Sequence, residues 1–262
     1  MAVVSGLAAV VAVAAFLVAD GGSGPGGPRA LTSDEADRLA ITRFRNYEAQ
    51  GRELTITVPD TAGELVVTGS VDYEKKLGYG VVHGTGRDTS SDGLIQWTAT
   101  SVFVHPMANA PAHAPASPPR SDWFSRPLQS AGSSLDSALA IALGLGSDRP
   151  DNAQLLPQNG ATWWGRDRVD GHQVDIMTGP RTYSHSHDGS GTTGSGPASS
   201  GPASSGPASS GPASRVRYWV GSDGTMYRVR VSLASEPQPV VIDFESRRYV
   251  PVKAVPGVTP AP

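Results

Sequence analysis

Apolar and polar residues alternate most regularly over residues 215–231, RVRYWVGSDGTMYRVRV. Two alternating runs flank the turn-forming residues 221–224, which is typical of a β-hairpin with a four-residue loop. Pairing Val220 with Thr225 across this loop predicts a sheet with one apolar and one polar face. The apolar face would carry Val216, Tyr218, Val220, Tyr227, Val229 and Val231, and the polar face Arg215, Arg217, Trp219, Met226, Arg228 and Arg230.

The same alternation recurs in other parts of the chain. Four successive runs joined by short polar turns favour an antiparallel meander over repeated βαβ units. A further run contains a turn and predicts a fifth and a sixth strand, and a last run follows the hairpin. These runs lie at residues 54–58, 65–73, 78–84, 94–105, 169–177 and 240–244.

Two stretches have helical periodicity. Thr32 and Glu35 have the spacing of a capping box, which predicts the start of an amphipathic helix of about 17 residues. Ser133 or Ser134 caps a second helix over residues 135–145, which is almost wholly apolar and is expected to be buried. Runs of strands combined with few helices predict an α+β fold.

The N-terminal residues 1–20 are predicted to be a transmembrane anchor or a signal peptide. Residues 2–19 are uncharged and mostly apolar, and as a helix they would span about 27 Å, close to the thickness of the hydrocarbon core. No Lys or Arg precedes them, and a cleavage site near Ala19 is the alternative. We favour the anchor, which predicts a single-pass cell-membrane protein with an extracytoplasmic domain; the alternative is a secreted protein.

Composition predicts the boundaries of the remaining parts. Residues 21–30 are a Gly-rich tether, and residues 31–250 form the folded domain. Residues 184–214, which contain four GPAS units, have nothing to bury and are predicted to be a disordered insertion. Residues 251–262 are predicted to be a flexible tail, and the Pro-rich residues 106–119 an exposed loop or strap.

Charge and cysteine content exclude several classes of function. The formal net charge is −3 with mixed signs, so the sequence has no electrostatic footprint for nucleic acid. The chain has no cysteine, which excludes disulfides, thiol catalysis, Cys-ligated zinc and an acylated lipoprotein cysteine.

Two kinds of site chemistry have simpler explanations. His185 and His187 lie in the densest set of potential metal ligands, residues 183–188, but Gly and Ser surround them, and a solvated loop is the favoured interpretation. The sequence has no GxSxG nucleophile elbow, so a Ser/His/Asp hydrolase is disfavoured. We therefore predict no enzyme activity, no metal and no cofactor.

The arginines of the hairpin would repel one another across the strands. Asp175, Asp243 and Glu245 lie on neighbouring predicted strands at alternating positions. We predict that these acids interleave with the arginines on the polar face; independent solvated charges are the alternative.

Five stretches of the chain resemble the LolA/LppX-like half-barrel family of bacterial lipid-handling envelope proteins, and in particular its actinobacterial membrane-associated members. These stretches are GSVDYEKKLGYG (69–80), GLIQWTATSVFVHP (93–106), ALGLGSDRPDNAQLL (142–156), VDGHQVDIMTGP (169–180) and RYWVGSDG (217–224). The resemblance implies a curved antiparallel sheet, or half-barrel, with helices covering its concave face. In that family the concave face can hold acyl chains, and regulatory domains share the fold. Lipoprotein members carry an acylated cysteine, which this chain lacks.

Two functions follow as hypotheses. The first is a membrane-tethered module that binds or senses a lipid or another apolar ligand between sheet and helices. The second is a regulatory or scaffolding domain with a filled core that binds another envelope protein. They differ in the apolar space that each needs. The predicted ligand-binding residues are Val216, Tyr218, Val229, Ile242, Phe244, Trp97 and Trp163, although core packing is the commoner role of such aromatic residues.

Overall fold

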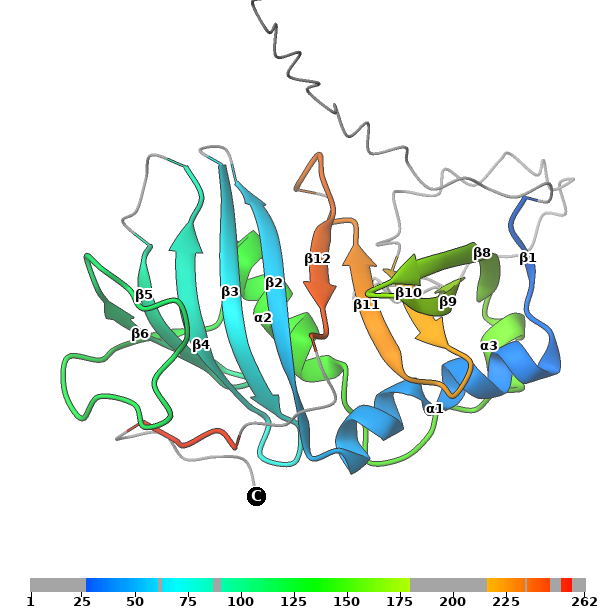
Figure 1. The fold of residues 1–262 in the computed structure, drawn as a ribbon, viewed down its shortest axis with the longest axis horizontal. Coiled ribbons are helices and arrows are strands. Elements are labelled where there is room, and N and C mark those ends of the chain that lie inside the picture. Colours follow the sequence, from blue (N-terminus) through cyan, green and yellow to red (C-terminus); the bar gives the residue numbers. More distant parts are fainter. Residues whose placement is uncertain are drawn as a thin grey trace, which may run out of the picture.

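The computed structural model describes residues 27–60, 63–86, 91–179, 216–233, 235–245 and 251–255. Within them the strands form one large, open, curved antiparallel sheet in the order β1-β8-β9-β10-β11-β12-β2-β3-β4-β5-β6-β7 (Figure 1). The strands are β1 (Arg29–Ala30), β2 (Gly51–Asp60), β3 (Gly63–Asp72), β4 (Leu77–Gly84), β5 (Gly93–Trp97), β6 (Ser101–Pro106), β7 (Phe124–Pro127), β8 (Thr162–Val169), β9 (His172–Thr178), β10 (Val216–Gly221), β11 (Met226–Val231) and β12 (Val240–Asp243).

The sheet consists of two meanders joined through the last strand. Strands β2 to β7 follow one another in space as in sequence, and so do β8 to β12. Strand β12 pairs with β2, with Ile242 opposite Ile56, so the C-terminal strand lies in the middle of the sheet. The short strands β1 and β7 form its two edges.

The predicted long helix is α1 (Ser33–Glu48), and its capping box is present. The Thr32 hydroxyl accepts from the Glu35 N–H, and the Glu35 carboxylate accepts from the Thr32 N–H. The second predicted helix is α2 (Ser134–Gly144), capped by Ser133, and a single turn forms α3 (Leu155–Gln158). No helix in the described residues is long and apolar enough to cross a membrane, and the predicted span 2–19 lies outside them.

An ion pair fixes the start of α2. Asp136 is fully buried, and its carboxylate accepts hydrogen bonds from both terminal nitrogens of Arg126 at 2.5 and 2.7 Å and from the Gln129 N–H at 2.7 Å. Burial alone would raise the pKa of Asp136, but these hydrogen bonds and the charge of Arg126 outweigh burial and lower it. The carboxylate therefore joins α2 to strand β7.

The main core lies between α2 and one face of the sheet. Apolar residues from β2, β3, β5, β11 and β12 pack there with Ala138, Leu139 and Leu143 of α2. A second cluster joins α1 to β9 and β10 through Leu39, Met177 and Val220. Successive side chains of a strand point to opposite sides of the sheet, so every second residue of each strand contributes to the core on the α2 side.

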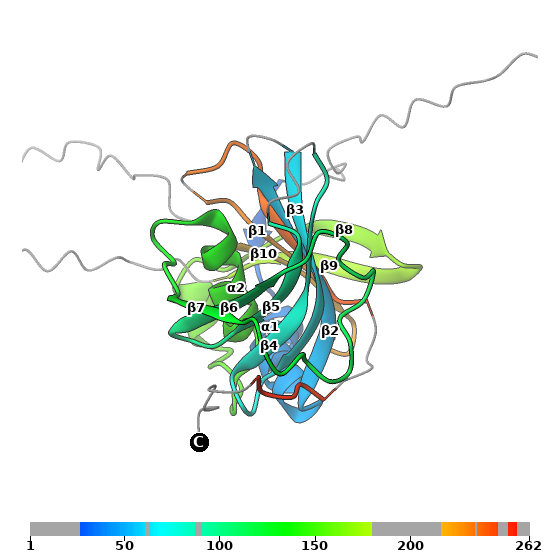
Figure 2. The same cartoon turned by 90° about the vertical axis from the view of Figure 1, so that its left-hand side faces the viewer.

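The opposite face of the sheet is also covered in part. Leu77, Tyr79, Val81 and Leu94 pack there against the Pro-rich segment 106–119, which we call the strap. Helix α2 and the strap thus lie on opposite sides of the sheet (Figure 2).

The predicted register of the hairpin is wrong by two positions at its open end. Val216 pairs with Val231 and Trp219 with Arg228, and a bulge then pairs Val220 with Met226. Tyr227 is the extra residue of this bulge. Met226 therefore faces the main core, and Tyr227 packs on the other face, the reverse of the prediction. The physical reason is local, because the Asp223 carboxylate accepts hydrogen bonds from the backbone and the hydroxyl of Thr225 and keeps that residue in the turn.

The predicted strand 94–105 is in fact two strands, β5 and β6. The Thr98 hydroxyl accepts hydrogen bonds from the N–H groups of Thr100 and Ser101, which stabilises a tight turn between them. The edge strands β1 and β7 were not predicted; β1 consists of the last residues of the predicted tether.

The first residues of the predicted tail, 251–255, are ordered and packed. Val252 and Val255 are buried, and the Gln96 amide donates to the Lys253 carbonyl and accepts from the Val255 N–H, each at 2.9 Å. The predicted anchor, the insertion 184–214 and the His-rich residues 183–188 lie outside the described residues.

Candidate functional site

Four of the seven residues predicted to bind an apolar ligand lie inside the packed core, and the other three are half-buried. Trp97, Val229, Ile242 and Phe244 are at most 2% exposed and belong to the cluster that packs on α2. Val216 and Tyr218 are half-buried against the same cluster. Trp163 packs instead against the α1 cluster.

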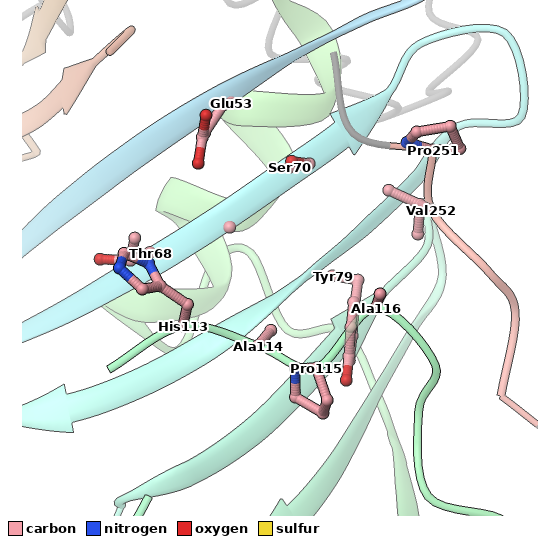
Figure 3. Close-up of a pocket in the computed structure, with 11 residues that line it drawn as sticks. Glu53, Thr68, Ser70, Tyr79, His113, Ala114, Pro115, Ala116, Pro251 and Val252 are labelled. Atoms are coloured by element: carbon pink, nitrogen blue, oxygen red, sulfur yellow. The ribbon is translucent and has the colours of Figure 1, made fainter. Parts of the chain in front are cut away.

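A groove is found on the opposite face of the sheet, under the strap. It has a volume of about 290 Å³, and we call it the strap groove. Strands β2 to β4 form its floor, and the strap and the start of the C-terminal segment form its walls (Figure 3). It is lined by Glu53, Thr68, Gly69, Ser70, Tyr79, His113, Ala114, Pro115, Ala116, Pro251 and Val252.

The floor of the strap groove follows from strand register. Glu53 pairs with Ser70, Ser70 with Tyr79, and Tyr79 with Gln96, so these four residues form a row across β2 to β5. Gln96 ends the row by holding the C-terminal segment in place. Strand alternation places Glu53 and Tyr79 on this face, but nothing in the sequence indicates that the strap folds back over them.

Two polar groups of the strap groove have no partner among the described residues. The Glu53 side chain is half-buried and makes no hydrogen bond or ion pair there. The Tyr79 hydroxyl is buried and also lacks a hydrogen-bond partner. Burial raises the pKa of Tyr79 to about 12, so the phenol stays protonated and is able to donate a hydrogen bond. These groups mark the groove as a candidate binding site.

A second, smaller pocket of about 150 Å³ lies beside the N-terminus of α1. Leu31, Ala36, Gln154 and Pro157 are among the residues that line it. None of the seven residues predicted to bind ligand lines either pocket.

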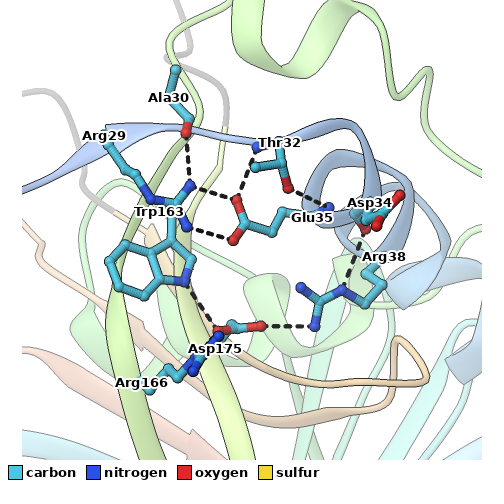
Figure 4. Close-up of polar contacts among 9 residues, drawn as sticks. All are labelled: Arg29, Ala30, Thr32, Asp34, Glu35, Arg38, Trp163, Arg166 and Asp175. Carbon is cyan, nitrogen blue, oxygen red and sulfur yellow. Dashed lines mark hydrogen bonds and ion pairs between the residues drawn. The ribbon is translucent and has the colours of Figure 1, made fainter.

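A polar cluster joins α1 to β1, β8 and β9 (Figure 4). Arg29 donates to both oxygens of Glu35 at 2.7 Å and lies 4.2 Å from the ring centre of Trp163. The Trp163 indole N–H donates to Asp175 at 3.0 Å, and Arg38 donates to the other oxygen of Asp175 at 2.7 Å.

This cluster holds elements together and is poorly suited to acid–base chemistry. The hydrogen bonds from Arg29, opposed by burial and aided by the Thr32 N–H, lower the pKa of Glu35 from 4.5 to about 2. A carboxyl group with so low a pKa stays ionised near neutral pH, so it is a weak base and no proton donor. Arg29 and Thr32, which donate hydrogen bonds to Glu35, fix the position of the first turn of α1.

The predicted interleaving of acids and arginines is confirmed for one pair. Arg228 and Asp243 stand directly opposite each other on β11 and β12 and form an ion pair. The prediction for Asp175 is wrong, because this residue lies opposite Val220 and binds Arg38 of α1. Glu245 accepts a hydrogen bond from Thr55 instead.

No group of three or more His, Asp or Glu side chains in the described ranges is placed to hold a metal ion.

Comparisons with known proteins add little to this description. No family model matches the chain, and no curated protein matches it. Among solved structures, it is similar to an uncharacterized conserved protein from Thermus thermophilus, with a TM-score of 0.36 and 9% sequence identity over 80% of this chain and 85% of that chain. A similarity this weak carries no argument about fold family or function.

Proposed function

We propose that this chain is a protein-binding domain of the bacterial envelope, a half-barrel with a filled core that residues 2–19 tether to the membrane. Its helices cover the concave face of the sheet, and its partner is another envelope protein. It acts by binding and has no catalytic role.

One observation supports this choice over a lipid carrier. Six of the seven residues that would line a lipid cavity belong to the cluster on α2 or pack against it, and four of them are at most 2% exposed. A cavity for a drug-sized or larger apolar ligand needs roughly 300 Å³ or more of open space. None of the seven residues lines either of the two pockets described above, and side chains in contact inside a protein leave little open space between them.

The experiment that separates the two functions is lipid analysis of the purified full-length protein. The chain is extracted from membranes in mild detergent, and native mass spectrometry and solvent extraction measure the lipid bound per chain. We expect no stoichiometric lipid, and no uptake when phospholipid vesicles are offered. One tightly bound lipid per chain would overturn the proposal in favour of the carrier.

A second measurement tests the protein partner directly. Cross-linking in intact cells, followed by denaturing electrophoresis, should give a discrete adduct heavier than the chain. A chain that stays free of adducts at every cross-linker length would contradict a scaffolding role.

A further inference from the structure

The strap groove contains an acidic group without a counter-charge in the described residues. Glu53 is half-buried on β2 at one end of the floor, and among the described residues it has no ion pair. A carboxylate that is partly removed from water loses hydration, and a nearby cation restores favourable interactions. The other ionisable side chains lining the groove are Tyr79 and His113, and His113 is exposed.

The remaining lining groups suit the body of a long side chain. Pro115 and Pro251 give the groove rigid apolar walls, and Tyr79 adds an aromatic ring. Lysine and arginine bury their methylene stems against apolar surfaces while the charged end finds a polar partner. An aromatic ring also attracts a cation placed over its face.

Hydrogen-bonding capacity in the groove is also unused. The buried Tyr79 hydroxyl has no partner among the described residues, but Tyr79 stands two strands away from Glu53 and its oxygen points away from that carboxylate (Figure 3), so a cation held at Glu53 does not reach it. The Ser70 side chain lies on the floor between Glu53 and Tyr79, and its hydroxyl is able to accept a hydrogen bond from an ammonium or a guanidinium group; Thr68 lies two positions further along β3. A volume of about 290 Å³ suits a single side chain better than a folded element.

We propose that the strap groove binds a lysine or arginine side chain that the partner protein presents, with Glu53 as its counter-charge. The proposal rests on the protein-binding function given above and names the site and the chemistry of that contact. A single carboxylate with neutral neighbours is a poor site for a divalent metal ion, which needs several anionic or neutral oxygen ligands. The bound group is therefore an organic cation.

The test uses small cations that mimic the two side chains. The full-length, isotope-labelled chain in detergent micelles is titrated with n-butylammonium and with N-methylguanidinium at constant ionic strength, and amide chemical shifts are followed by NMR. We expect saturable shifts at Thr68, Ser70, Tyr79 and Ala114. The neutral analogue n-butanol should bind at least about fivefold more weakly, because charge-assisted hydrogen bonds are stronger than neutral ones.

A pair of matched variants identifies the counter-charge. Glu53→Gln removes the negative charge inside the groove and should weaken binding of both cations about tenfold. Glu64→Gln removes the same charge from an exposed position on β3 and should leave binding unchanged. Ser70→Ala removes the hydroxyl that stands directly opposite Glu53 and should weaken binding two- to fivefold, which provides a second test if Glu53→Gln folds poorly.

The outcomes separate this proposal from the proposed function. The groove site is overturned if the cations cause no saturable shifts there, or if they bind Glu53→Gln as tightly as the wild type. Neither result contradicts the proposed function of a lipid-free, protein-binding domain. A lipid found in the core overturns the proposed function, whatever the cations do. Saturable binding that depends on Glu53 in a lipid-free chain supports both.

Discussion

The indole ring of Trp97 on β5 lies directly against the backbone of Gly78 on β4. A Cβ atom added at Gly78 would stand 2.1 Å from the nearest atom of that ring. The Trp97 N–H donates to the Leu139 carbonyl at 3.1 Å, which ties the ring to α2. A glycine at this position therefore allows the largest core side chain to reach the helix.

Gly78→Ala should destabilise the domain because the new methyl group forces Trp97 away from its place. We expect a loss of about 2–3 kcal/mol in the free energy of unfolding, measured by urea denaturation. Gly144→Ala is the matched control, since nothing lies within 4 Å of an added Cβ in that helical position. It should be neutral or stabilising by up to about 1 kcal/mol. Equal effects of the two substitutions would contradict the packing of Trp97 on Gly78.

Gln96→Leu should release the C-terminal segment from the sheet. The buried amide of Gln96 is the hydrogen-bond partner of both the Lys253 carbonyl and the Val255 N–H. Leucine leaves these two groups unsatisfied, at a cost of about 1–3 kcal/mol. Hydrogen exchange at the Val255 amide should speed up at least tenfold, while the amides of β2 keep wild-type rates.

The conservative variant Gln96→Glu is the control for volume. It keeps the size of the side chain and an acceptor for the Val255 N–H, but it loses the donor to the Lys253 carbonyl and buries a carboxylate against that oxygen, so it should release the segment at least as strongly as Gln96→Leu. Unchanged exchange in both variants would mean that the valines alone hold the segment.

Glu35→Gln should reveal an acid-sensitive part of the stability. The pKa of Glu35 is lowered from 4.5 to about 2 in the folded protein. A lowered folded-state pKa contributes stability that is complete above pH 4.5 and is lost as the pH falls toward 2. Urea unfolding between pH 7 and pH 2.5 should show a gap between wild type and variant that narrows on acidification. Glutamine is still able to accept the hydrogen bond from the Thr32 N–H, so the capping box should be kept and the gap should report the lost charge. A gap that does not change with pH would contradict this expectation and would indicate that the substitution disrupts the cap.

The cross-strand pair of Arg228 and Asp243 should contribute little. Both side chains are about 30% exposed, and ion pairs of this exposure contribute less than about 1 kcal/mol. A double-mutant cycle with Arg228→Gln and Asp243→Asn should give a coupling energy in that range. The coupling should shrink when NaCl rises from 0.05 to about 0.5 M, because salt screens exposed charges. A coupling above about 2 kcal/mol, or one indifferent to salt, would contradict this assignment.

Much of the fold could be predicted because its signals are local. The alternation in β2, β3, β4 and β12 and the capping box at Thr32 involve residues only a few positions apart. The bulge at Tyr227 could not be predicted, because an alternating pattern of apolar and polar residues does not reveal where one extra residue is inserted into a strand. The short edge strands were missed because two to four residues carry no usable periodicity.

The candidate site was less accessible from sequence than the fold. The seven residues predicted to bind a ligand are apolar or aromatic, and the same properties place residues in a core. Glu53 and Tyr79 lie on two strands 26 positions apart and meet the strap only after the chain has turned back. No local pattern records a contact of this kind.

The sequence by itself determined which residues face which side of each regular strand, where α1 and α2 begin, and that a sheet dominates the fold. Those features follow from backbone geometry and from interactions within one or two turns. Only the tertiary structure decided that β12 pairs with β2, that Asp175 binds Arg38 instead of a hairpin arginine, and that the strap and residues 251–255 enclose a groove beside Glu53. These contacts join distant segments, and they form because apolar faces and buried polar groups find partners only when the whole chain has folded.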